Sequence, residues 1–248
     1  MELGIDGRGA AVGGASKGLG LATAQALAAA GVRVAICSRD GSRIEEAAKA
    51  IGPLATPIVA DVSTPDGASA FIESARAALG RIDILVANGG GPIAGPAEGV
   101  ALEAIRESID RSLLAMLVMC GAVVPGMKEA GWGRILAITS VGVKQPLANM
   151  VHSNTARAGL TAYLKTLSSE VISSGITVNS ILPGLHLTDR VHQLMGDNLD
   201  ALLKSLPTGK AGSAEDFGKI AAFLCSDWTS YLTGVALPVC GGASTTLT

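Results

Sequence analysis

Short runs of apolar and β-branched residues alternate with longer stretches of helical periodicity along the chain. The short runs predict strands, and the longer stretches predict helices between them. The expected strands are residues 9–12, 32–37, 57–60, 82–87, 134–139, 177–182 and 237–239, and the expected helices are residues 18–30, 41–51, 65–79, 103–129, 153–173 and 213–225. This alternation is typical of a parallel sheet with helices on both faces. We therefore predict an α/β fold, a doubly wound sandwich with about seven parallel strands.

The chain shows no internal break that would divide it into two domains. Its 248 residues suffice for one large core, and there is no repeat, low-complexity tract or linker. We expect a single domain over residues 1–248. The segment from about residue 185 to 212 interrupts the alternation, and two interpretations stay open: a mobile substrate lid or an ordinary surface insertion.

A glycine-rich segment joins the first expected strand to the first expected helix. Gly14, Gly18 and Gly20 would let the backbone come close to a pyrophosphate, and the helix N-terminus would supply N–H donors and a partial positive charge. Small residues at such a turn also serve plain packing, so three glycines alone are a weak signal. The segment nevertheless favours dinucleotide binding.

Polar and glycine residues also follow the other expected strands. These strand ends carry Ser38-Arg39, Asp61-Val62, Asn88 to Gly91, Thr139-Ser140 and Pro183-Gly184. Ligands of doubly wound sheets bind at the carboxyl ends of the strands, near the point where the strand order reverses. We expect these residues to meet at one edge of the sheet and to form the ligand site.

Composition and charge narrow the range of partners. The formal net charge of −2 provides no cationic surface for a polyphosphate backbone, so we expect no nucleic-acid partner. The longest apolar run, residues 113–124, is shorter than the roughly 20 residues that a membrane span needs, and it predicts a buried helix. The four cysteines lie far apart without metal-ligand spacing, which predicts reduced core residues and no metal site. The first residues lack a secretory pattern, and we expect a cytoplasmic protein.

Several motifs occur together and in order: Gly14-x-x-x-Gly18-x-Gly20, Asp61-Val62, Ala87-Asn88-Gly89-Gly90, Gly133-Arg134-Ile135, Ser140, Pro183-Gly184 with Thr188, and Gly241-Gly242. In this set the chain resembles the short-chain dehydrogenase/reductase family, nearest the β-ketoacyl carrier-protein reductases, from about residue 5 to 242. The resemblance implies a Rossmann-like fold that binds NAD(P)(H). It also implies hydride transfer between nicotinamide and a carbonyl or alcohol carbon of a small-molecule substrate.

The resemblance assigns a set of cofactor-binding residues, which are Gly14, Ser16, Lys17, Gly18, Leu19, Gly20, Arg39, Asp61, Val62, Asn88, Gly89, Gly90, Arg157, Pro183 and Thr188. An Arg at the end of the second strand accommodates a 2′-phosphate, whereas an acidic residue there would bind the ribose hydroxyl. Arg39 stands at that place, and Lys17 adds a second cation. We predict NADP(H) in preference to NAD(H), although the adjacent Asp40 weakens that preference.

The chain departs from the family at the catalytic positions. The family uses an Asn, a Ser and a Tyr-x-x-x-Lys pair, and the register places Ser140 on the serine, Ser153 on the tyrosine and Arg157 on the lysine. Counting back from residues 124–127 places Ser112 on the asparagine. A serine hydroxyl is a far poorer acid than a phenol, and an arginine stays protonated and cannot relay protons. The positive charge is kept, and the usual proton donor is missing.

Two interpretations of this divergence stay open. In the first, Ser140 and Ser153 hydrogen-bond a substrate oxygen, Arg157 stabilises the developing alkoxide, and water, Lys144 or His186 delivers the proton. In the second, the chemistry has lapsed and the chain is an NADP(H)-binding protein with a sensing or scaffolding role. We favour retained redox activity, because the cofactor set is intact and hydride transfer depends chiefly on positioning.

The helices expected at 103–129 and 153–173 carry more apolar residues than one buried face needs, including Leu113, Leu114, Met116, Leu117, Val118, Leu160, Leu164 and Leu167. Surplus apolar surface suggests a subunit interface, and the alternative is that these residues are buried within one chain. The family resemblance implies a homotetramer built partly on these helices. We expect a homo-oligomer, either a tetramer or a dimer.

Overall fold

A seven-stranded sheet forms the centre of the computed structural model, which describes residues 2–188 and 199–247. The strand order is β3-β2-β1-β4-β5-β6-β7, and every neighbouring pair is parallel. The strands are β1 (Gly9–Val12), β2 (Arg33–Ser38), β3 (Ala55–Val59), β4 (Ile84–Ala87), β5 (Gly133–Ile138), β6 (Ile176–Pro183) and β7 (Ala236–Val239). The predicted Rossmann-like sandwich with seven parallel strands is confirmed.

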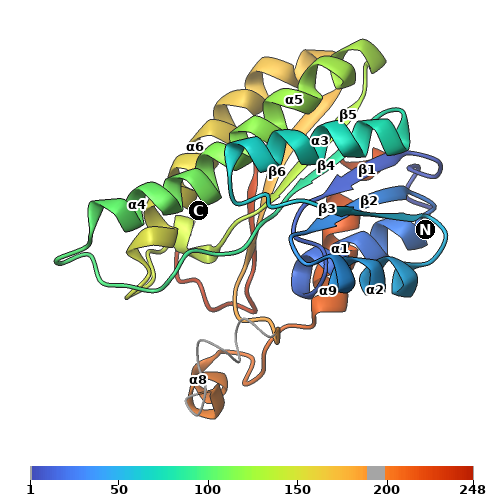
Figure 1. Ribbon diagram of the computed structural model, residues 1–248. Helices are drawn as coiled ribbons and strands as arrows, with labels where there is room; N and C mark the ends of the chain where they lie inside the picture. The colour runs from blue at the N-terminus through green and yellow to red at the C-terminus, as the bar shows by residue number, and fades with distance from the viewer. Residues whose placement is uncertain (1, 189–198, 248) are drawn as a thin grey trace.

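Helices cover both faces of this sheet (Figure 1). One face carries α1 (Gly18–Ala29), α2 (Gly41–Ile51) and α9 (Ala214–Leu224), and the other carries α3 (Pro65–Leu79), α4 (Leu102–Ile109), α5 (Ala115–Ala130) and α6 (Val151–Val171). The short helix α8 (Leu199–Ser205) lies apart from both layers (Figure 1). The chain therefore forms three layers, as the alternating pattern predicts.

Each face of the sheet has its own apolar core. Phe71, Met119 and Leu160 belong to the cluster under α3, α5 and α6, whereas Leu27 and Phe217 belong to the cluster under α1, α2 and α9. Every residue of β1 and β4 is buried, because helices cover these central strands on both sides. The sheet is thus a rigid platform for the loops at its carboxyl edge.

The strand order reverses beside β1. This strand pairs with β2 on one side and with β4 on the other, so the chain crosses from one half of the sheet to the other between β3 and β4. The loops that leave β1 and β4 consequently turn away from each other, which opens a crevice at the carboxyl edge. The fold places the expected ligand site at this crevice.

The helical stretch Leu102–Ala130 meets the length and hydropathy criteria for a membrane span. These criteria alone are weak support for a span, because core helices pass the same test, and six side chains of α5 are buried. Among the surplus apolar residues of α5 and α6, Leu114, which directly precedes α5, is 39% exposed, whereas four are buried within the chain: Met116, Leu160, Leu164 and Leu167. Much of the surplus therefore belongs to the core of one chain.

The expected lid at residues 185–212 lies partly outside the described residues, since 189–198 are not among them. At its ends, an isolated bridge pairs His186 with Gly212. The Gly212 amide donates to the Leu185 carbonyl at 2.9 Å. The two ends of the segment are thus joined at its base.

Candidate active site

A cavity of about 790 Å³ follows the carboxyl edge of the sheet. Every residue that the sequence assigns to cofactor binding lines it: Gly14, Ser16, Lys17, Gly18, Leu19, Gly20, Arg39, Asp61, Val62, Asn88, Gly89, Gly90, Arg157, Pro183 and Thr188. Ser140 and Ser153 line the same cavity. The fold therefore brings the expected cofactor set and most of the expected catalytic set into one space.

The glycine loop after β1 packs so closely that side chains are excluded. Gly14 and Gly18 have φ of +56° and +61°, in the left-handed region that favours glycine. A Cβ atom at Gly20 would lie 2.5 Å from the Gly14 carbonyl oxygen, and one at Gly13 would collide with the Asn88 carbonyl oxygen. Gly14, Gly18 and Gly20 line the cavity without side chains, which leaves the close approach that a pyrophosphate requires.

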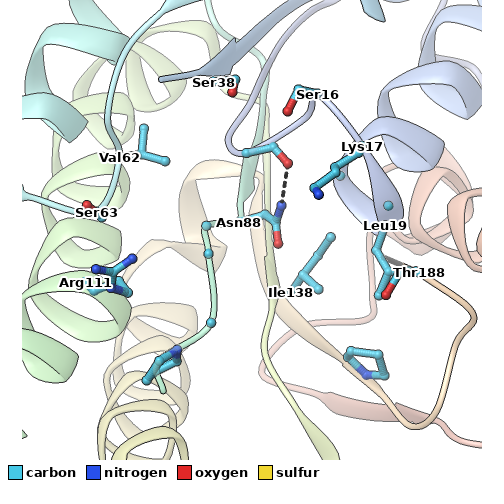
Figure 2. Close-up of a pocket in the computed structure, with 18 of the residues that line it drawn as sticks. Ser16, Lys17, Leu19, Ser38, Val62, Ser63, Asn88, Arg111, Ile138 and Thr188 are labelled. Atoms are coloured by element: carbon cyan, nitrogen blue, oxygen red, sulfur yellow. Dashed lines mark hydrogen bonds between the residues drawn. The ribbon is translucent and has the colours of Figure 1, made fainter. Parts of the chain in front are cut away.

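Asn88, directly after β4, holds this loop from the neighbouring strand (Figure 2). Its side-chain amide donates to the carbonyl oxygens of Gly13 at 2.9 Å and Gly14 at 3.2 Å. On the other side, the Ala15 amide donates to the Cys37 carbonyl of β2 at 2.9 Å. The loop conformation is therefore fixed by the protein itself.

The N-terminus of α1 faces the same space. Lys17 occupies the N-cap position without a side-chain cap, and the first turn contains no acidic residue. The first amides and the positive end of the helix dipole are consequently available to an anion. Figure 2 shows the Lys17 amino group pointing toward Asn88.

Among the described residues that line the cavity, cations outnumber carboxylates, although the chain as a whole has a formal net charge of −2. The charged lining residues are Lys17, Arg39, Arg43, Arg111 and Arg157 on the positive side and Asp40 and Asp61 on the negative side. A polyanion would be attracted to such a crevice.

Both carboxylates already have partners. Asp40 caps α2: it accepts hydrogen bonds from the Arg43 amide at 3.1 Å and the Ser42 hydroxyl at 2.9 Å, and it pairs with the Arg43 guanidinium at 3.2 Å. The Arg43 amide is the main reason that its pKa is lowered. Asp61 accepts from the Ser63 amide at 3.0 Å, and hydrogen bonding by Ser63 is the main cause of its lowered pKa. The repulsion that Asp40 would exert on a phosphate near Arg39 is thereby reduced.

The catalytic candidates come from the end of β5 and the start of α6. The Ser140 oxygen accepts from the Gly142 amide at 3.0 Å, so its own proton is left to donate. Ser153 is buried in the first turn of α6. Arg157, one turn further, donates from Nη1 to the carbonyl oxygens of Ile138 and Thr139. Two hydroxyls and a fixed cation thus share this end of the cavity.

The described lining contains neither a phenol nor an imidazole. Tyr163 packs against the core, and desolvation raises its pKa to about 12, while Tyr231 is fully exposed elsewhere. His186 is buried edge-on against Phe217, with ring centroids 5.0 Å apart, and this burial lowers its pKa. Lys144 is likewise outside the described lining. The structure therefore does not bring the two proton donors considered from the sequence, His186 and Lys144, to the cavity wall.

Ser112 is separated from the main cavity. It is buried in a π-helical turn, Asp110–Leu114, which interrupts the single helix expected at 103–129. It faces a small void of about 10 Å³ that Arg111 and Arg157 also line. A void of this size has room for about one water molecule, so Ser112 lies beside the site without lining the main cavity.

Comparison with known proteins decides the family. A family model described as Enoyl-(Acyl carrier protein) reductase matches residues 13–244. The 3-oxoacyl-[acyl-carrier-protein] reductase FabG of Pseudomonas aeruginosa is 34% identical over 248 residues, covering 97% of this chain and 98% of that protein. The chain belongs to the short-chain dehydrogenase/reductase family.

Solved structures of similar proteins support the same assignment. L-sorbose reductase from Gluconobacter frateurii, in complex with NADPH and L-sorbose, superposes with a TM-score of 0.93 at 33% identity over the full length of both chains. A 7α-hydroxysteroid dehydrogenase in complex with NADH and 7-oxo glycochenodeoxycholic acid has a TM-score of 0.92 at 27% identity, covering 100% of this chain and 98% of that one. As a short-chain dehydrogenase/reductase, the chain is an NAD(P)-dependent oxidoreductase.

Sequence reasoning missed several lining residues of this short-chain dehydrogenase/reductase, among them Arg43, Arg111 and Met150. Arg43 had a readable signal, because it lies three residues after the N-cap Asp40, in the first turn of a helix that starts at the ligand edge. Arg111 had none, since its direction depends on the π-helical turn, which the apolar period does not reveal.

Proposed function

We propose that this chain is an NADP(H)-dependent oxidoreductase that transfers a hydride between nicotinamide and a carbonyl or alcohol substrate with an atypical catalytic set. The observation that carries the proposal is the single cavity in which the glycine loop and the α1 N-terminus lie together with Ser140, Ser153 and Arg157. The similarity to FabG and to L-sorbose reductase supports it. When bound, the cofactor supplies or accepts the hydride.

The lining residues fit such a cofactor. Gly14, Gly18 and Gly20 leave room for a pyrophosphate, because a side chain at Gly20 would strike the loop backbone and the other two have positive φ. Asp61 and Val62 flank the adenine in this proposal, and the backbone from Asn88 to Gly90 passes beside the ribose. Pro183 and Thr188 lie at the nicotinamide end, where Thr188 bonds the carboxamide.

Cofactor selectivity rests on Arg39. We propose that Arg39 binds the 2′-phosphate, with Lys17 and Arg43 adding positive charge, and that Asp40 interferes little because α2 and Arg43 already engage it. NADPH should therefore bind more tightly than NADH. Titration of the purified protein with both cofactors by calorimetry tests this, and tighter binding of NADH would overturn it.

The chemical step relies on electrostatics. Ser140 and Ser153 donate hydrogen bonds to the substrate oxygen, and the fixed charge of Arg157 stabilises the negative charge that develops there. The proton comes from water in this scheme, because His186 and Lys144 do not line the cavity. A structure with NADPH bound tests the arrangement: Ser153 and Arg157 facing away from the nicotinamide would contradict it.

A second function is favoured by one observation, the lack of a phenol or imidazole in the described lining. In it, the chain is a catalytically impaired NADP(H)-binding protein with a sensing or scaffolding role. A panel of ketones, aldehydes, quinones and enoyl thioesters, assayed by NADPH consumption, separates the two functions. Turnover with any class supports the oxidoreductase, and none throughout, together with tight NADPH binding, supports the sensor.

We further propose that residues 1–248 act as one catalytic domain with a substrate lid within 185–212, and that the protein forms a homo-oligomer in the cytoplasm. The joined base of the lid segment, from Leu185 to Gly212, supports the lid. The partly exposed Leu114, the last residue of the π-helical turn before α5, supports an interface beside that helix. Sedimentation distinguishes a monomer from a dimer or a tetramer.

A further inference from the structure

Arg111 lines the cavity but has no part in the proposed hydride transfer. It lies in the π-helical turn between α4 and α5, and it borders both the main cavity and the small void beside Ser112. A π-helical turn holds one residue more than an α-helical turn, so the side chains that follow it are rotated around the helix. Arg111 is the second residue of this turn, and its side chain lies at the ligand edge of the sheet.

The guanidinium of Arg111 lies against the glycine run that follows β4. A Cβ atom at Gly90 would lie 3.7 Å from its Nη1. Figure 2 shows Arg111 on the same side of the cavity as Val62 and Ser63. Its charge also reaches Asp61, whose pKa is lowered first by Ser63 hydrogen bonding and then further by Arg39 and Arg111. Arg111 therefore borders the part of the cavity that the proposed function gives to the adenosine.

The chemistry of Arg111 suits a planar ligand. Within residues 2–188 and 199–247, no carboxylate forms an ion pair with its side chain, whereas Arg106 in the preceding helix pairs with Glu103 at 2.9 Å. Arg111 is half-buried, which reduces the competition from water. A guanidinium is flat, delocalised and weakly hydrated, so it stacks on aromatic rings as well as attracting anions.

We propose that Arg111 is a further cofactor-binding residue whose guanidinium packs on the adenine of the bound dinucleotide. This inference rests on the proposed function, and it assigns Arg111 a role different from that of Arg39. Arg39 contacts a group that only NADP(H) carries, whereas Arg111 contacts a ring that both cofactors share. Loss of Arg111 should therefore weaken both cofactors equally, and loss of Arg39 should weaken NADPH alone.

Calorimetric titration with NADPH, NADH and adenosine 2′,5′-bisphosphate tests this role. Arg111→Met, which keeps an unbranched stem but loses the charge and the planar end group, should bind all three about tenfold more weakly than the unaltered chain. Arg111→Lys, which keeps the charge alone, should have affinities between those of Arg111→Met and those of the unaltered chain. Arg106→Met is the matched control, because Arg106 lies outside the cavity lining and should leave every affinity unchanged.

The outcomes separate this inference from the proposed function. If the unaltered chain binds neither dinucleotide, the proposed function fails and this role fails with it. If it binds them and Arg111→Met stays within about twofold, only the role of Arg111 is rejected. Weaker binding of NADPH alone would show a phosphate contact and would also reject adenine packing. Ligand-free melting temperatures identify a folding defect in Arg111→Met, in which case the affinities of Arg111→Lys decide between the two roles.

Discussion

The two ends of the cavity depend on different parts of the protein. At the phosphate end, Gly13, Gly14 and Gly20 lie so close to neighbouring backbone, and to Asn88, that the shape of the loop is built into the main chain. At the reaction end, the proposed chemistry depends on what the single side chains of Ser153 and Arg157, which line the cavity there, can donate. The first end is hard to alter without unfolding it, whereas the second can lose its acid and keep its shape. The side chains that would carry the reaction can therefore change while the shape of the glycine loop is kept.

The largest effect is expected at the reaction end, from the double variant Ser153→Tyr with Arg157→Lys, which restores the Tyr-x-x-x-Lys pair of the family. A positioned phenol is a general acid, and such groups contribute about 10²- to 10⁴-fold to proton transfer, so kcat/KM for a ketone should rise by a factor in that range. NADPH consumption measures the gain. The control is Ser153→Phe with Arg157→Lys, which adds the ring without the hydroxyl and should give no gain. A folded, cofactor-binding double variant that is no faster would contradict the argument.

The opposite end is tested by Gly20→Val. A Cβ at this position would lie 2.5 Å from the Gly14 carbonyl and 2.7 Å from the Asn88 amide nitrogen. We expect NADPH affinity to fall by about tenfold or more and stability by about 1–3 kcal/mol, because the loop must move. Calorimetry and urea unfolding measure the two effects.

Gly121→Ala is the control, since nothing lies within 4 Å of the added carbon in α5 and the change should stabilise the helix by about 0.5–1 kcal/mol. Normal NADPH binding by Gly20→Val would contradict the idea that close backbone packing fixes the shape of the glycine loop.

A smaller effect is expected from Arg39→Ala, which tests selectivity within the phosphate end. Removing a charge-assisted bond costs about 1.5–3 kcal/mol, so the preference for NADPH over NADH should fall by about tenfold or more while NADH affinity stays unchanged. Parallel titrations with the two cofactors give the ratio. Equal weakening of both would show that Arg39 supports the fold of the site and does not read the phosphate.

The last prediction concerns the dependence of stability on pH, which should affect the whole fold rather than one end of the cavity. Burial raises the pKa of the thiols of Cys37, Cys120 and Cys225 to about 12, from an ordinary value of 9.0. A folded-state pKa above the unfolded one means that the stabilisation is complete below pH 9.0 and is lost as the pH rises from 9.0 toward 12. Melting temperatures should therefore decline above pH 9.0, and Cys120→Ala should show a shallower decline. An identical slope in that variant would contradict the linkage.

The sequence predicts the fold and most of the residues that line the cavity, for a physical reason. Parallel strands end at one edge, so a polar or glycine residue directly after a buried strand is placed at the ligand site by strand position alone; Asn88 and Arg39 are examples. Residues placed by helices are harder to predict. Ser112 was expected in the catalytic set, but it lies in a π-helical turn and lines only a small void beside the main cavity, whereas its neighbour Arg111 lines the main cavity as well. His186 was considered a proton donor from its position after Pro183-Gly184, but it packs against Phe217.

The bonds from Asn88 to the carbonyls of Gly13 and Gly14 have a thermodynamic consequence. They engage two acceptors of the loop with the neighbouring strand, and together with the bond from the Ala15 amide to the Cys37 carbonyl they fix the shape of the loop before any partner arrives. Association then requires little ordering of the chain, and the entropy loss on docking falls mainly on the small molecule. A protein built in this way should recognise its coenzyme by lock-and-key association rather than by induced fit.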